Sequence, residues 1–76
     1  MSEADPRDVA AELLEAAAAE LDSAAAHCRV AAQHYRDRDI PRAAAHAWAA
    51  EGHVREAAER LADQSREHAR RSRLNV

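Results

Sequence analysis

The chain has 76 residues, a formal net charge of −3 and no lysine, and its aromatic side chains are one tyrosine and one tryptophan. This length allows one domain at most, close to the limit at which a single chain buries enough core to fold alone. An acidic chain without lysine is poorly suited to general nucleic-acid binding, so nucleic acid is the partner that the composition supports least.

The single cysteine, Cys28, lies in an apolar helical run and has no second cysteine with which to form a disulfide inside the chain. We interpret it as a reduced thiol that packs as a small residue. No apolar run approaches the length of a membrane span, and the chain does not open on a basic segment followed by an apolar one. These observations predict a cytoplasmic protein without a membrane partner.

The first half of the chain predicts one long helix over residues 6–36. Asp5 can cap the free amides of a helix start, and Pro6 suits the first helical position because that position needs no amide hydrogen. No residue that breaks helices follows before Arg36. Residues 1–4, like residues 73–76 at the other end, have no feature that would order them, and we expect both segments to be disordered.

The stretch from Asp37 to Pro41 predicts a turn, followed by a second helix over residues 41–71. A proline is poorly tolerated inside a helix and well tolerated in its first turn, and it disfavours helical geometry at the preceding residue. Asp39 then caps the second helix. Gly52 is the one position in that helix at which the sequence allows a kink or a break.

Apolar residues recur at a heptad-like spacing in both helices, so a register can be chosen for their packing. When the turn is centred on Asp39, facing residues have numbers that add to 78, and most layers set a larger side chain against an alanine, as with Leu21 and Ala57. Alternating large and small residues let two helices interdigitate at close separation. The pattern predicts an all-α fold, an antiparallel two-helix hairpin formed by the whole chain as one domain.

One edge of this hairpin carries small residues and one large aromatic side chain. Two helices cover only one face of each other, so an exposed alanine strip favours packing against a second hairpin. We therefore expect a homodimer in the form of a four-helix bundle; the alternative is that alanine-rich faces are only good helix surface. The predicted interface consists of Ala18, Ala25, Ala32, Ala44, Trp48, Ala58 and Ala62.

The other edge carries four of the five histidines. In the same register, the facing residues on this edge add to 80, which sets His34 opposite His46, His27 opposite His53, and Glu20 opposite Arg60. Imidazole nitrogens bind transition metals such as zinc, copper, nickel or iron, and facing helices can bring such ligands together. The candidate metal ligands are His27, His34, His46 and His53, with Glu20 and Glu56 as the nearest carboxylates.

Two other interpretations of the histidine edge stay open. The histidines can be ordinary polar residues at the rim of a helical pair, in which case no cofactor is expected. They can also form a contact that responds to pH, because protonation of facing rings makes them repel each other. This second interpretation predicts a lower melting temperature at about pH 5.5 than at about pH 7.5; equal melting temperatures would contradict it.

Catalysis has little support in the sequence, and we expect no enzyme activity. Cys28 follows His27 directly, and adjacent residues in a helix point about 100° apart, so they do not form a nucleophile–base pair. A chain with a single glycine has no glycine-rich phosphate loop. A hairpin offers no concave pocket unless association builds one.

Residues 32–48 resemble the core of one tetratricopeptide repeat. Ala32 occupies its small-residue site, Tyr35 an aromatic site, Asp39 the turn, Ala44 the close-packed alanine site and Trp48 the later aromatic site. The resemblance covers less than half the chain, and no family pattern covers the whole of it. It implies that the turn joins two antiparallel helices and that the hairpin binds other proteins.

The sequence thus predicts a non-catalytic interaction protein, an adaptor or accessory subunit that associates with itself and with another protein. A small metal-binding bundle that uses the histidine edge is the alternative from a different class. A hairpin dimer that binds nucleic acid through its C-terminal arginines is a third hypothesis.

Overall fold

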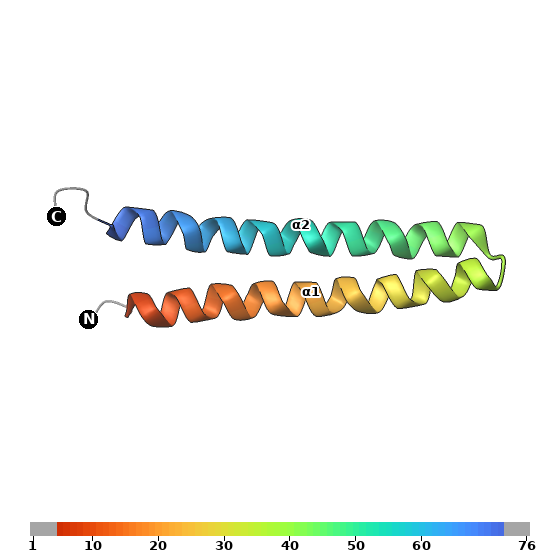
Figure 1. Ribbon diagram of the computed structural model, residues 1–76, viewed down its shortest axis with the longest axis horizontal. Helices are drawn as coiled ribbons and strands as arrows, with labels where there is room; N and C mark the ends of the chain where they lie inside the picture. Colours follow the sequence, from red (N-terminus) through yellow and green to blue (C-terminus); the bar gives the residue numbers. More distant parts are fainter. Residues whose placement is uncertain (1–4, 73–76) are drawn as a thin grey trace.

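Two long helices form the whole of the described structure. The computed structural model describes residues 5–72, in which α1 (Pro6–Arg36) and α2 (Ile40–Arg71) run antiparallel. The helices lie side by side, with the connecting turn at one end and the start of α1 and the end of α2 at the other (Figure 1). The predicted all-α antiparallel hairpin is confirmed. The expected disorder of residues 1–4 and 73–76 concerns segments outside the described residues.

Both helices begin as the sequence predicts, with an aspartate cap and a proline in the first turn. The Asp5 side chain accepts a hydrogen bond from the Arg7 amide at 2.8 Å, and Asp39 accepts one from the Arg42 amide at 3.3 Å. Helix α2 starts at Ile40, one residue before the predicted start at Pro41. Pro41 is tolerated there because the first amides of a helix have no partner within it.

The turn owes its shape to a residue in the left-handed backbone region, Arg38, with a φ of 65°. The Asp39 amide donates to the His34 carbonyl at 2.8 Å, and the Arg38 amide donates to the Tyr35 carbonyl at 3.1 Å. These two bonds are the pattern of a Schellman motif, which satisfies the last carbonyls of a helix. The motif usually has glycine at the position that Arg38 holds, because a side chain is strained at positive φ.

Replacing Arg38 by glycine should therefore stabilise the hairpin. Relief of the left-handed strain outweighs the added freedom of the unfolded chain, and we expect a gain in unfolding free energy of up to about 1 kcal/mol. Chemical denaturation monitored by circular dichroism measures the change. Arg42→Gly is the control. It also replaces an arginine by glycine, but at a helical position, and it should lower stability. A loss of stability in Arg38→Gly would contradict this account of the turn.

Gly52 does not interrupt α2, which continues through it to Arg71. Gly52 does not have positive φ, and a Cβ atom placed on it would meet no other heavy atom within 4 Å. The break that the sequence allowed at this position is therefore absent from the described helix. The continuous helix keeps the register between α1 and α2 constant on both sides of Gly52.

The helices meet along a seam of alanines. The buried residues of the described chain are three alanines in each helix, spaced seven residues apart: Ala17, Ala24 and Ala31 in α1, and Ala43, Ala50 and Ala57 in α2. A seven-residue spacing returns a side chain to nearly the same face of a helix. Because alanine is small, facing rows of alanine let the two backbones approach closely.

The larger apolar side chains do not fill this seam. Leu21, Val54 and Leu61 are each exposed to between 43% and 47%, and Tyr35 is 48% exposed. Cys28 is also exposed. The prediction that large side chains interdigitate with alanines between the helices is therefore wrong for the large partners. At the separation set by the alanine rows, a leucine has no room between the helices and lies beside the seam.

Candidate functional site

Four histidines form one continuous row along an edge of the hairpin, alternating between the helices. The ring centroids of His34 and His46 are 5.5 Å apart, those of His46 and His27 are 5.2 Å apart, and those of His27 and His53 are 5.3 Å apart. The register predicts two of these neighbours, His34 with His46 and His27 with His53. The contact between His27 and His46 joins the two predicted pairs into one row, which we call the histidine row.

The centre of the histidine row is a hydrogen bond between two imidazoles. The Nδ1 atom of His27 lies 2.9 Å from the Nδ1 atom of His46, and both side chains come from half-buried residues. One of the two nitrogens must carry a hydrogen and the other must accept it. If both rings are protonated, both nitrogens carry hydrogens and this bond is lost. The predicted lower melting temperature at acid pH therefore stays a prediction, with this bond as its structural basis.

A carboxylate closes one end of the row. The Glu20 Oε2 atom lies 2.6 Å from the Nδ1 atom of His53, and each side chain is about one-third exposed. The register predicts that Glu20 faces Arg60, but the two residues do not pair. Arg60 instead lies 3.6 Å from Glu56 on its own helix. The long arginine side chain reaches a carboxylate one helical turn away, which leaves Glu20 to the nearer histidine.

The predicted metal ligands are thus adjacent, but they do not form a preformed four-ligand site. Within residues 5–72, no group of three or more histidine, cysteine, aspartate or glutamate side chains is arranged to hold a metal ion. Glu56, one of the two nearest carboxylates from the sequence, is 56% exposed and pairs with Arg60. The Nδ1 atoms of His27 and His46 are close enough to each other to bind the same ion.

The opposite edge of the hairpin is apolar. Leu14 and Leu21 each precede a buried alanine by three residues, which places them about 60° from the seam around the axis of α1. His27 follows Ala24 by three residues and therefore lies about 60° from the seam on the other side. Val54 and Leu61 follow buried alanines of α2 by four residues and lie on the same side as Leu14 and Leu21. We call these four residues the leucine–valine face; they are 43–47% exposed.

The predicted alanine interface borders this face. Ala25, Ala32, Ala44 and Ala62 are half-buried, and Ala18 and Ala58 are exposed. Trp48 is 79% exposed and precedes Ala50 by two residues, which places it nearly opposite the seam on the outer side of α2. It shares a shallow surface depression with Glu51, Gly52 and Arg55. The large aromatic side chain therefore flanks the alanine strip instead of lying in its centre.

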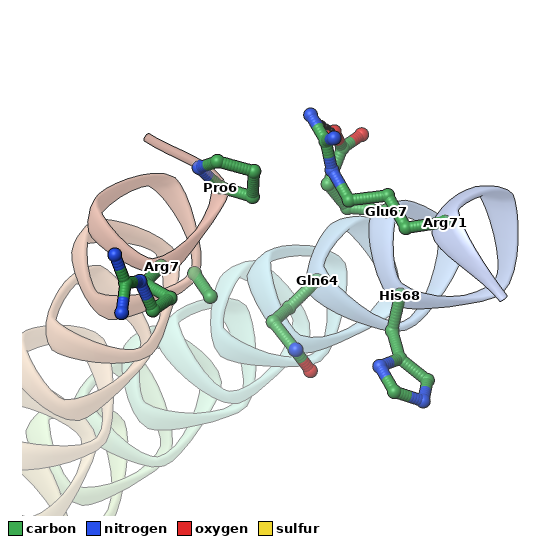
Figure 2. Close-up of a pocket in the computed structure, with 7 residues that line it drawn as sticks. Pro6, Arg7, Gln64, Glu67, His68 and Arg71 are labelled. Atoms are coloured by element: carbon green, nitrogen blue, oxygen red, sulfur yellow. Dashed lines mark ion pairs between the residues drawn. The ribbon is translucent and has the colours of Figure 1, made fainter. Parts of the chain in front are cut away.

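The open end of the hairpin carries most of the C-terminal arginines, and they pair within their own helix. Figure 2 shows Glu67 and Arg71 together on one side of α2, with His68 on another side. Arg71 lies 3.4 Å from Glu67, and Arg70 also pairs with Glu67. Arg66 contacts Asp63 at 2.6 Å. Among the described residues, the close partners of these arginines belong to α2.

The start of α1 and the end of α2 also interact electrostatically, over a longer distance than an ion pair. The bond from the Arg7 guanidinium, helped by the Arg7 amide, holds the pKa of Asp5 below its ordinary value, and the charge of Arg71 makes a smaller contribution in the same direction. The bond from Arg70 similarly lowers the pKa of Glu67. Both residues are only half-buried, so solvent screens these interactions.

Asp5→Asn should reveal the pH dependence of the α1 cap. A carboxylate whose folded pKa is lowered adds stability that is present above its unfolded pKa, about 3.9, and is lost as pH falls through the folded value. Asparagine caps a helix almost as well but carries no charge. Wild type should melt above Asp5→Asn at neutral pH, and thermal melts should converge in the acid range. A difference that stays constant down to the lowest pH would contradict this.

No helix among residues 5–72 combines the length and the apolar composition that a membrane span requires. Comparisons of the chain with family profiles, with curated proteins and with solved structures found no match. The resemblance of residues 32–48 to a tetratricopeptide repeat therefore stays a prediction. The features of the hairpin that bear on function are its histidine row and its leucine–valine face.

Proposed function

We propose that this protein is a non-catalytic interaction module whose working form is a pair of hairpins joined through the leucine–valine face. The observation that carries the proposal is the position of the large apolar side chains. Among the described residues, the single hairpin buries only alanines and leaves Leu14, Leu21, Val54 and Leu61 half exposed on one edge. A second hairpin that covers this edge turns it into the core of a four-helix bundle.

The energetics of the single hairpin favour association. Hydrophobic stabilisation grows with the apolar area removed from water, and an alanine side chain removes little. Six alanines are the entire buried set among the described residues. Folding must also offset the conformational entropy of about 1 to 2 kcal/mol for each ordered residue. Burial of the leucine–valine face supplies the apolar area that the alanine seam lacks.

The exposed surface of the chain is large for its mass. The chain exposes 6155 Å², whereas a folded monomer of 8.3 kDa exposes about 4,600 Å². For comparison, a standard interface covers roughly 800 Å² on each partner. A second copy of the chain suits this face because a two-fold axis would set each leucine–valine face against an identical one.

The C-terminal arginines do not support nucleic-acid binding in the way that the leucine–valine face supports association. The arginines of α2 beyond Gly52 each lie within 4.0 Å of a carboxylate of the same helix: Arg55, Arg60, Arg66, Arg70 and Arg71. A phosphate backbone would have to compete with these carboxylates. The adaptor hypothesis accounts for the apolar edge, and the nucleic-acid hypothesis does not.

Native mass spectrometry of the purified full chain, with any affinity tag removed, tests the proposal. We expect a species of twice the 8.3 kDa chain mass, and light scattering in solution should give the same mass over a hundredfold range of concentration. A monomer at every concentration, with full helical circular dichroism, would overturn the proposal. A partner protein would then be the remaining occupant of the leucine–valine face.

A further inference from the structure

The histidine row contains a pair of nitrogens with the spacing of two ligands on one metal ion. His27 comes from the middle of α1 and His46 from the first half of α2, and their Nδ1 atoms are 2.9 Å apart. Imidazole is a common ligand of divalent zinc, copper and nickel. The row lies on the edge opposite the leucine–valine face, so an ion bound there leaves the proposed association surface free.

The two nitrogens are close enough to bind the same ion. Metal–nitrogen bonds of about 2.05 Å at an angle of 90° place two neighbouring ligand atoms about 2.9 Å apart, whereas a tetrahedral angle places them about 3.4 Å apart. The observed 2.9 Å is the length of a hydrogen bond, and a modest rotation of the two rings brings the nitrogens to either spacing. We propose that His27 and His46 bind a divalent transition-metal ion, such as Ni²⁺ or Cu²⁺, through their Nδ1 atoms.

The rest of the row holds this pair in place. His53 stacks on His27 with an angle of 15° between the ring planes, and His34 stacks on His46 with an angle of 23°. Glu20 fixes His53 through its 2.6 Å contact with Nδ1. Side chains already held by their neighbours lose less freedom when a ligand binds, and this lowers the cost of binding.

Binding needs one tautomer change, a rotation of the two rings that turns both Nδ1 atoms toward the ion, and no additional protein ligand. The ring that donates the hydrogen in the His27–His46 bond moves it to its own Nε2 atom, and both Nδ1 atoms are then free to coordinate. Water occupies the other positions of the ion, which is accessible because both residues are only half-buried. Because the ligands come from different helices, the bound ion joins α1 to α2 and stabilises the hairpin.

Isothermal titration of the tag-free full chain with Ni²⁺ tests the site. We expect one Ni²⁺ per chain, with at least tenfold weaker binding in His27→Gln and in His46→Gln. His68→Gln is the matched control, because His68 lies at the open end, near Pro6 and Arg71, and takes no part in the row; its affinity should stay within twofold of wild type. Circular dichroism confirms that each variant is folded.

Thermal melts give a second readout that does not depend on the affinity measurement. Ni²⁺ should raise the melting temperature of wild type and of His68→Gln, and should leave that of His27→Gln unchanged. Wild-type affinity for Ni²⁺ in the double variant His27→Gln/His46→Gln, or no binding by the folded wild type, would overturn the site. None of these results depends on whether the chain is a dimer.

Discussion

Leu21→Glu should convert the paired hairpins into monomers that lose much of their helical structure. Leu21 is 45% exposed in the single hairpin and lies at the middle of the leucine–valine face. In a dimer this position is buried, and a glutamate there would place an unpaired charge in an apolar contact. We expect a loss of at least about 2 kcal/mol for each chain that carries the change. Light scattering measures the mass, and circular dichroism measures the helical content.

Val30→Glu is the control for this experiment. Val30 is 40% exposed, close to the exposure of Leu21, but it follows Ala24 by six residues and lies on the side of the histidine row. The same change from an apolar to an acidic side chain should leave the dimer intact there. If Leu21→Glu and Val30→Glu have equal effects on mass and helicity, the leucine–valine face is not the association surface.

Ala57→Leu should disrupt the seam between the two helices. Ala57 is 1% exposed, and the close approach of the backbones leaves no space for three more carbon atoms. The helices must separate, or the leucine must adopt a strained rotamer, and either change costs about 1 to 3 kcal/mol or more. This loss is a large share of the stability of so small a domain. Urea denaturation followed by circular dichroism measures it.

Ala45→Leu provides the matched control for the seam. Ala45 is exposed on α2, and leucine is nearly as good a helix former as alanine. Its unfolding free energy should therefore stay within a few tenths of a kcal/mol of wild type. Equal stability of Ala57→Leu and wild type would show that the helices are not held at the separation that the alanine rows set.

The boundaries of the hairpin could be predicted from the sequence because local chemistry specifies them. Asp5 with Pro6, and Asp39 with Pro41, are start signals that act through the backbone of their own helix. The left-handed residue of the turn was not predicted. Arg38 has no local preference for positive φ, and it adopts this conformation because the helices on both sides are fixed by their packing.

The positions of the large side chains could not be predicted from periodicity alone. A heptad pattern identifies the face of a helix that meets its partner, but it does not give the separation of the helices. Leu21 and Ala24 are both near that face, and only the close approach of the backbones decides that Ala24 is buried and Leu21 is not. The separation depends on both helices together.

The contacts within the histidine row could also be predicted only in part from the sequence. The register predicted that His27 lies opposite His53, because these residues occupy the same layer. The contact between His27 and His46 joins different layers and depends on the directions of the two rings. The pairing of Glu20 with His53 also depends on side-chain directions, since Arg60 takes a partner from its own helix. Spacing in the sequence contains neither piece of information.

Thermal unfolding at different protein concentrations decides whether the hairpin depends on a second copy of the chain. If the hairpin depends on a second copy for its stability, unfolding also separates the two chains, and the melting temperature must rise with concentration. We expect a clear rise across a hundredfold range for the wild-type chain. A melting temperature that does not change with concentration, for a chain that unfolds reversibly, would show that the alanine seam alone holds the hairpin together.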